Sequence, residues 1–235
     1  MNTTVCCLLY GDYPKLADRC LRPVSELYRN SASIRLGCNE VSGSTNQIIS
    51  DLFPSSDNLM ILKASPQIYK YPMMELLFRS KPLDTEFVMW FDDDSYITDP
   101  NPVEWLARLE ALMRSEDADM AGSIYHIPAM PHQNEWRRLH CSWFNSAKES
   151  KRTTFATGGW WMIRTKVLMD YGWPHCDLKH RGGDVLLGEL IKHQSLKLIN
   201  FKSGVAINAD ASGKESASKR RGYDEPPIGA RITGP

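Results

Sequence analysis

Three consecutive aspartates, Asp92, Asp93 and Asp94, directly follow the apolar run 87–91. Adjacent carboxylates repel one another, and burial at the end of a strand makes the repulsion worse. A hard divalent cation removes this conflict, because oxygen ligands suit Mg²⁺ and Mn²⁺. In extended backbone, residues i and i+2 point to the same side. Asp92 and Asp94 can therefore face one metal ion while Asp93 turns back into the protein; the alternative is a solvated acidic turn that caps the next helix.

A second segment, 154–164, has the pattern of a strand interrupted by Gly158 and Gly159 and followed by two tryptophans. Glycines inside a strand often mark the close approach of a ligand or another backbone. Trp160 and Trp161 must point to opposite faces of an extended backbone. One of them can lie in the core while the other offers a flat surface to a sugar or a base. The alternative is that both are core residues and the glycines form a bulge.

A third segment places Asp184, preceded by Gly183, at the start of an apolar helical pattern. An aspartate in this position can simply cap the helix and interact with its dipole. If the fold brings it near the acidic triplet, the same carboxylate can act as a general base that removes a proton from a hydroxyl group.

The elements that must position these side chains alternate along the chain. Apolar runs predict strands, and apolar residues at helical spacing predict helices between them. Strands separated by helices of this length indicate βαβ units and a mainly parallel sheet, in which ligands bind beyond the carboxyl ends of the strands. The predicted strands cover 5–10, 33–36, 59–62, 87–91, 118–125, 154–163 and 196–201, and the helices 15–29, 44–53, 67–79, 102–114 and 183–193.

Two stretches depart from this alternation. Residues 127–152 combine prolines, histidines, basic residues and aromatic residues, and we predict a long excursion over the end of the sheet. The residues after Asp210 are rich in Ser, Gly, Lys, Arg and Pro. We therefore expect one α/β domain over 1–210 and an irregular extension over 211–235.

The composition narrows the class of protein. The chain has 235 residues, with 28 Lys plus Arg and 28 Asp plus Glu, so its formal net charge is zero and indiscriminate binding to polyanions is not expected. The six cysteines include no CxxC pair, which favours free thiols in a reducing compartment over disulfides or a structural zinc. The apolar runs are too short to span a membrane or to form a signal peptide. We expect a cytoplasmic protein without a membrane partner.

Together, the three segments resemble the ordered motifs of inverting GT-A glycosyltransferases, and most closely those of the Fringe-like and core-1 galactosyltransferase-like group. The likeness rests on FVMWFDDDSYI, TGGWWMIRTKVL and GGDVLLGELI, with the first strand VCCLLYGD, and it spans roughly residues 5–200. It implies a Rossmann-like GT-A fold, with a mixed, mainly parallel sheet flanked by helices. It also implies metal-dependent transfer of a sugar, with inversion, from a nucleotide-sugar such as a UDP-sugar to an acceptor hydroxyl.

The resemblance also implies roles for individual residues. Asp92 and Asp94 would hold Mn²⁺ or Mg²⁺, and Asp184 would be the catalytic base. The family supplies a further metal ligand, a histidine, after its last strand; here that region offers Asp210 or Asn208 instead. The residues implied for donor binding are Tyr10, Asp12, Lys70, Arg79 and Asp93, and those implied for the sugar and acceptor are Gly158, Gly159, Trp160, Trp161 and Gly183.

The acceptor is open at this stage. It can be a saccharide or another small hydroxylated molecule. It can also be 5-hydroxymethylpyrimidine in phage DNA, since the basic and aromatic residues of 136–152 and the basic residues of the tail suit a strand or a flipped base. The paired cysteines and the membrane anchor of the family are absent, which favours a bacterial or phage-infected host cytosol. A third reading, from another class, is a non-catalytic carbohydrate-binding protein that uses the tryptophans.

Overall fold

The computed structural model describes residues 1–129 and 131–209, so Asp210 and the predicted extension 211–235 lie outside the described residues. The strands are β1 (Thr3–Tyr10), β2 (Ser33–Asn39), β3 (Leu59–Ala64), β4 (Phe87–Asp92), β5 (Tyr96–Ile97), β6 (Met120–Pro128), β7 (Arg152–Arg164), β8 (Leu198–Asn200) and β9 (Val205–Ala206). The helices are α1 (Pro14–Arg29), α2 (Gly43–Leu52), α3 (Lys70–Arg79), α4 (Pro102–Ser115), α5 (Pro131–His140), the 3₁₀ turn η1 (Ser146–Lys148), α6 (Thr165–Asp170) and α7 (Gly183–His193).

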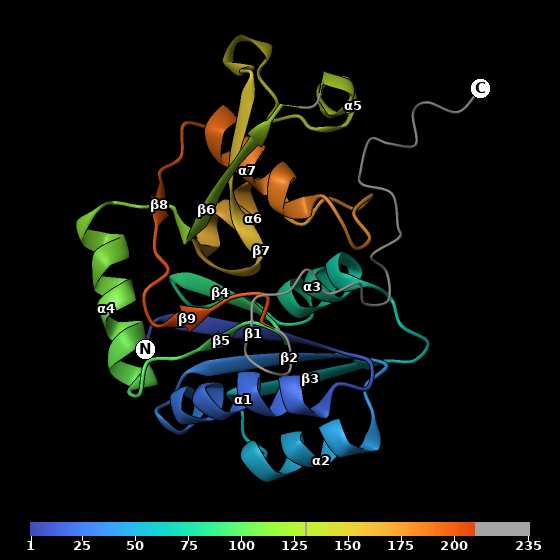
Figure 1. Cartoon of the computed structure of the whole chain (residues 1–235), viewed down its shortest axis with the longest axis vertical. Helices are drawn as coiled ribbons and strands as arrows, with labels where there is room; N and C mark the ends of the chain where they lie inside the picture. Colours follow the sequence, from blue (N-terminus) through green and yellow to red (C-terminus); the bar gives the residue numbers. More distant parts are fainter. Residues whose placement is uncertain (130, 210–235) are drawn as a thin grey trace.

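Seven of the strands form the central sheet, in the order β3-β2-β1-β4-β7-β6-β8. The neighbours from β3 to β4 pair in parallel, whereas β7 runs antiparallel to both β4 and β6. Strand β8 pairs in parallel with β6, and β5 forms a separate small sheet with β9. This confirms the prediction of an α/β fold with a mixed, mainly parallel sheet flanked by helices (Figure 1).

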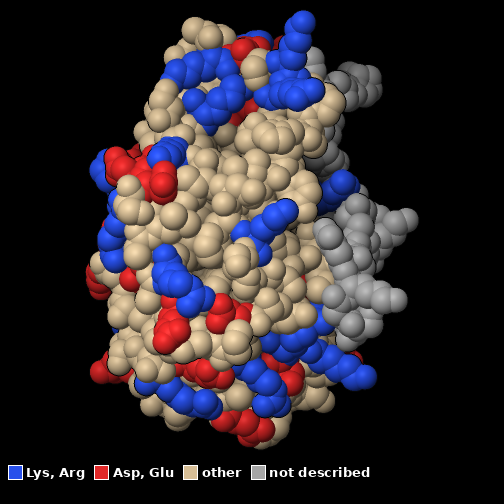
Figure 2. Space-filling view, turned by 60° about the vertical axis from the view of Figure 1, so that its left-hand side comes forward, with Lys and Arg blue, Asp and Glu red and all other residues tan. Residues whose placement is uncertain are grey.

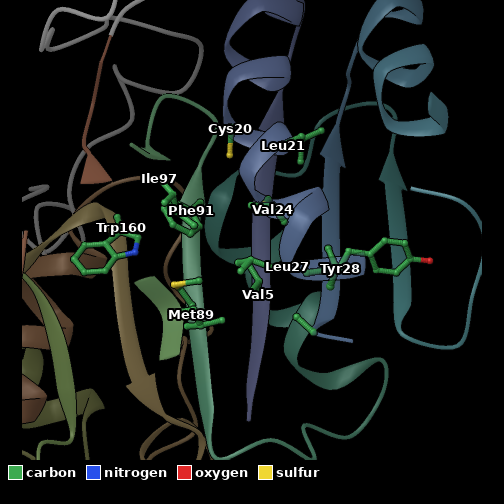
Figure 3. Close-up of a cluster of buried hydrophobic side chains, with 14 of the residues drawn as sticks. Val5, Cys20, Leu21, Val24, Leu27, Tyr28, Met89, Phe91, Ile97 and Trp160 are labelled. Atoms are coloured by element: carbon green, nitrogen blue, oxygen red, sulfur yellow. The ribbon is translucent and has the colours of Figure 1, made fainter. Parts of the chain in front are cut away.

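Both faces of the sheet are covered, which explains why its strands are continuous apolar runs rather than alternating ones. On one face, α1 and α4 cover a core that contains Val5, Leu27 and Met89, part of which is drawn in Figure 3. On the other face, α3 and α7 cover a core that contains Leu77, Trp90 and Leu186. The site residues are therefore held at the ends of strands that are fixed from both sides.

The stretch 127–152 is more ordered than the sequence predicts. β6 and the first half of β7 pair beyond a bulge at 122–124 and form a two-stranded arm, with α5 near its tip (Figure 1). Trp136 and Arg137 are buried there, at 5% and 1% exposure, and the Arg137 guanidinium donates to Asn134 and Gln133. These two residues are therefore buried and not part of the predicted basic and aromatic surface, whereas Arg138, Lys151 and Arg152 are exposed.

The expectations about membrane spans and about the cysteines can be compared with the described residues. Among the helices of 1–129 and 131–209, none combines the length and the apolar character that a membrane span requires. The six cysteines are all free, and only Cys176 is exposed. The prediction of free thiols is confirmed.

Candidate active site

The candidate site lies where the carboxyl ends of β1 and β4 meet the middle of β7. β1 pairs with β2 on one side and with β4 on the other, so the chain order reverses at β1, and this edge is where open α/β sheets bind ligands. The antiparallel register pairs Phe91 with Trp160, so the next pair in line is Asp92 and Gly159. The strand pairing itself thus brings the acidic triplet and the two glycines together.

Lys70, the first residue of α3, holds the first carboxylate of the triplet. Its ammonium nitrogen donates to Asp92 Oδ2 at 2.6 Å and to the Gly158 carbonyl oxygen at 2.6 Å, and its side chain is 7% exposed. Asp92 Oδ1 accepts from Trp90 Nε1 at 2.9 Å. Both oxygens of Asp92 therefore have protein donors, and its charge is neutralised by Lys70.

Asp184 approaches the same glycine from α7. A Cβ atom placed on Gly158 would lie 3.4 Å from Lys70 Nζ and 3.6 Å from Asp184 Oδ2, so the cation and the carboxylate face one point. Close packing of α7 on β7 permits this, because a Cβ on Gly188 would lie only 2.4 Å from the Thr154 carbonyl oxygen. Burial raises the pKa of the Asp184 carboxyl, while the Val185 amide and Lys70 act in the opposite direction. Such a carboxylate is a stronger base than an exposed aspartate.

The other two aspartates of the triplet have different surroundings. Asp93 is 2% exposed, and its Oδ2 accepts from the Tyr10 amide at 3.2 Å, which confirms that it turns back into the protein. This corrects the assignment of Asp93 to donor binding. Asp94 is 9% exposed, and its Oδ1 accepts from Ser95 Oγ at 3.4 Å. The Asp94 carbonyl accepts from the Ala209 amide at 2.7 Å, so the chain after β9 lies against the triplet.

The absence of a side chain at Gly159 lets Asn208 and Ser95 pack directly against β7. A Cβ there would lie 2.4 Å from Asn208 Oδ1 and 2.6 Å from Ser95 Oγ. The backbone N–H of Asn208 donates to Ser95 Oγ at 3.1 Å. Of the two candidates for a third ligand, Asn208 therefore lies next to the triplet, and Asp210 is outside the described residues.

Besides that of Asp93, four further assignments need correction. Trp160 and Trp161 point to opposite faces, but they are 0% and 2% exposed, because helices cover the sheet on both sides, so neither can stack on a sugar. Arg79 lies at the far end of α3, about 13 Å along the helix from Lys70, and pairs with Glu75. Gly183 packs against a tyrosine ring instead of lining an open site.

The remaining predicted donor residues lie on β1 or just beyond it. Tyr10 is buried at the end of this strand; its hydroxyl donates to Gln67 Oε1, and its ring centroid is 5.9 Å from that of His180. Asp12 lies in the exposed turn that follows. The roles of both residues stay predictions.

Sequence reasoning missed several residues of the site. Trp90 was within reach, because it precedes Asp92 by two positions on a strand and must share its side. Ser95 directly follows the triplet. By contrast, no local pattern marks Tyr71, which reaches α7 from α3.

Outside the candidate site, one cluster of side chains among the described residues has groups of the kinds that ligate metals. His175, Cys176 and Asp177 have ligand atoms within 4.8 Å of one another. The His175 Nδ1 already accepts a hydrogen bond from the Asp177 amide at 3.2 Å. This group belongs to the loop before α7 and is separate from the acidic triplet in sequence.

The sheet order and flanking helices define the GT-A class of glycosyltransferase folds, and solved structures agree. The mannosyltransferase PcManGT from Pyrobaculum calidifontis, in complex with GDP-Man and Mn²⁺, matches with a TM-score of 0.57 at 12% identity, over 86% of this chain and 55% of that one. S. aureus TarS 1–349 matches with a TM-score of 0.54 at 15% identity, over 86% of this chain and 58% of that one, and its complex with UDP matches equally well. The chain thus spans little more than half the length of these proteins.

At such low sequence identities, the structural likeness establishes the fold and no more. No protein-family model and no curated protein matches the sequence. The narrower resemblance to the Fringe-like group stays a prediction.

Proposed function

We propose that this protein is a glycosyltransferase that moves a sugar from a nucleotide-sugar to an acceptor hydroxyl with inversion at the anomeric carbon. The observation that carries the proposal is the convergence of Asp184 Oδ2 and Lys70 on Gly158, beside Asp92. In the GT-A fold this edge of the sheet is the ligand-binding edge. The solved structures with GDP-Man and Mn²⁺ or with UDP support a nucleotide donor, and we propose a UDP-sugar.

The residues present fit a divalent cation. Asn208 and Ser95 place an amide and a hydroxyl oxygen beside Gly159, and the Asp94 carboxylate lies 3.4 Å from the Ser95 hydroxyl. Hard cations such as Mn²⁺ and Mg²⁺ take oxygen ligands of these kinds. Asp94 would be the principal ligand, since Lys70 already neutralises Asp92. A bound cation would supply Lewis-acid stabilisation of the diphosphate leaving group.

The mechanism needs one proton acceptor. The acceptor oxygen attacks the anomeric carbon from the side opposite the leaving group, the bond from that carbon to the diphosphate oxygen breaks, and the nucleoside diphosphate leaves with the bonding electrons. The proton of the acceptor hydroxyl passes to Asp184 Oδ2, because Oδ1 is engaged by the Val185 amide at 2.9 Å. The raised pKa of Asp184 favours this transfer.

The structure narrows the alternatives from the sequence. The burial of Trp160 and Trp161 removes the sugar-stacking surface on which a non-catalytic carbohydrate-binding protein would depend. The burial of Trp136 and Arg137 withdraws two of the residues on which a DNA acceptor would depend. On the face drawn in Figure 2, Lys and Arg gather at one end and elsewhere lie among Asp and Glu, without a continuous basic stripe. We therefore propose a saccharide or small hydroxylated acceptor, and the free cysteines fit a cytoplasmic location.

The proposal is tested with a panel of nucleotide-sugars, Mn²⁺ and candidate acceptors, by measuring release of the nucleoside diphosphate. Asp184→Asn should lower turnover by about 10²–10⁴-fold while donor binding survives. Asp94→Asn should abolish Mn²⁺-dependent donor binding. Asp18→Asn, at a partly exposed aspartate paired with Arg22, is the matched control and should change neither.

Three results would count against the proposal. Substantial turnover by Asp184→Asn would show that another group takes the proton. Full activity in EDTA would remove the metal from the mechanism. If none of the donors is consumed under any condition, the assignment to glycosyltransferases is wrong.

A further inference from the structure

The start of α7, which carries Asp184, lies against a residue from another helix. The first N–H groups of a helix have no partner within it, and a side chain at the N-cap position usually accepts from one of them. Here the N-cap is Gly182, with φ at 84°, and it has no side chain to offer. The hydroxyl of Tyr71 lies against this first turn instead, and the backbone amides of Gly183 and Asp184 act to lower its pKa, as donors that face a hydroxyl do.

Tyr71 is the second residue of α3 and is 4% exposed. Its amide donates to the Lys179 carbonyl at 2.9 Å, and its ring meets Trp173 edge to face at 6.1 Å between centroids. A Cβ on Gly183 would lie 2.1 Å from Tyr71 Cζ and 2.3 Å from the hydroxyl oxygen. The absence of a side chain at Gly183 is therefore what allows the hydroxyl to reach the first turn of α7.

The neighbouring residue, Lys70, holds the opposite side of the site. It donates to Asp92 on β4 and to Gly158 on β7. Two consecutive residues at the start of α3 thus contact the strand of the acidic triplet and the helix of the candidate base.

We propose that Tyr71 is a positioning residue, whose hydroxyl caps α7 and thereby fixes the Asp184 carboxylate relative to Gly158 and Asp92. The contact with α7 stands independently of any activity, and its kinetic consequence rests on the proposed function. Burial, together with the negative charges of Asp184 and Asp92, raises the pKa of Tyr71 well above its usual range. The hydroxyl therefore stays neutral at ordinary pH.

The test is Tyr71→Phe, which keeps the ring and removes only the hydroxyl. The first readout is hydrogen exchange of the Gly183 and Asp184 amides, which should become about tenfold faster when their acceptor is lost. The second is kinetics: kcat should fall about tenfold while the KM for the donor stays the same, because the base is displaced and the donor site is not.

The matched control is Tyr28→Phe, which removes a buried hydroxyl bonded to Ser56 and the Pro54 carbonyl. It should leave exchange at 183 and 184, and kcat, unchanged. Gly183→Ala provides a second route to the same effect, since its methyl group would push α7 away from the Tyr71 hydroxyl.

Unchanged exchange at both amides in Tyr71→Phe and in Gly183→Ala would overturn the proposal. So would a fall in kcat no larger than that of Tyr28→Phe. If the wild-type chain transfers no sugar, the proposed function fails, but the exchange experiment still decides whether Tyr71 holds α7.

Discussion

The ion pair between Lys70 and Asp92 gives the sharpest quantitative prediction. The two side chains are 7% and 20% exposed, and the pair measures 2.6 Å. Lys70→Met keeps most of the aliphatic stem and removes the charge, which leaves Asp92 with one neutral donor, Trp90 Nε1, and leaves the Gly158 carbonyl without its donor. Breaking a buried pair from one side costs about 3–5 kcal/mol.

Asp92 is partly exposed, so we expect the lower end of this range, about 3 kcal/mol. For a chain of this length, that corresponds to a fall in Tm of about 6–12 °C. The assay is thermal and urea unfolding in EDTA, so that adventitious metal does not replace the lost cation. The double variant Lys70→Met with Asp92→Asn should be about 1–3 kcal/mol more stable than the sum of the two single losses of unfolding free energy implies, because it has no unpaired buried charge.

Lys166→Met is the control, because Lys166 pairs with Asp170 at a similar distance, 2.7 Å, but is 82% exposed. We expect no measurable loss of stability there, since exposed pairs contribute little. If Lys70→Met is no more destabilising than Lys166→Met, or if the double variant shows no coupling, the reasoning about this buried pair is wrong.

Two further predictions concern groups away from the site. Burial lowers the pKa of His193 in the folded protein below 6.5, so the unfolded chain binds a proton at this imidazole more readily than the folded chain does. The contribution of the neutral His193 to the free energy of unfolding is therefore complete above about pH 6.5. It is lost as the pH falls toward the lower pKa of the folded state. The urea concentration at the unfolding midpoint should therefore decrease as the pH is lowered from about 7 to about 5, and it should decrease less in His193→Gln. An equal dependence of the midpoint on pH in both proteins would contradict this. A thiol reagent should label one cysteine, Cys176, in the native protein and six in denaturant. Rapid native labelling of a second thiol would show that the cores open more readily than their packing implies.

The sequence predicted the fold well because the relevant signals are local. The predicted helix 183–193 agrees with α7, and the apolar run 87–91 lies within β4 (Phe87–Asp92). The arm was missed because its strands 124–128 and 152–156 pair across an intervening helix, and their residues are mixed rather than apolar. The periodicity of apolar residues and the propensity of each residue type predict a helix or a strand, but they do not identify the strand with which it pairs.

At the candidate site too, the local features were predictable from the sequence and the packing between distant segments was not. The spacing of the acidic triplet was enough to predict that Asp93 turns inward, because alternation along a strand is a local property. The same alternation placed Trp160 and Trp161 on opposite faces. It did not reveal that helices cover both faces, and this is why neither tryptophan is available to a sugar.

The sequence by itself therefore determined which carboxylates stand at strand and helix ends, and that the chain forms an α/β sheet. Only the tertiary structure decided what faces each carboxylate: Lys70 neutralises Asp92 from 22 residues away, and Tyr71 packs against Gly183, the residue before Asp184. The physical reason is that burial and charge pairing depend on contacts between segments distant in the chain, whereas periodicity reports only on neighbours.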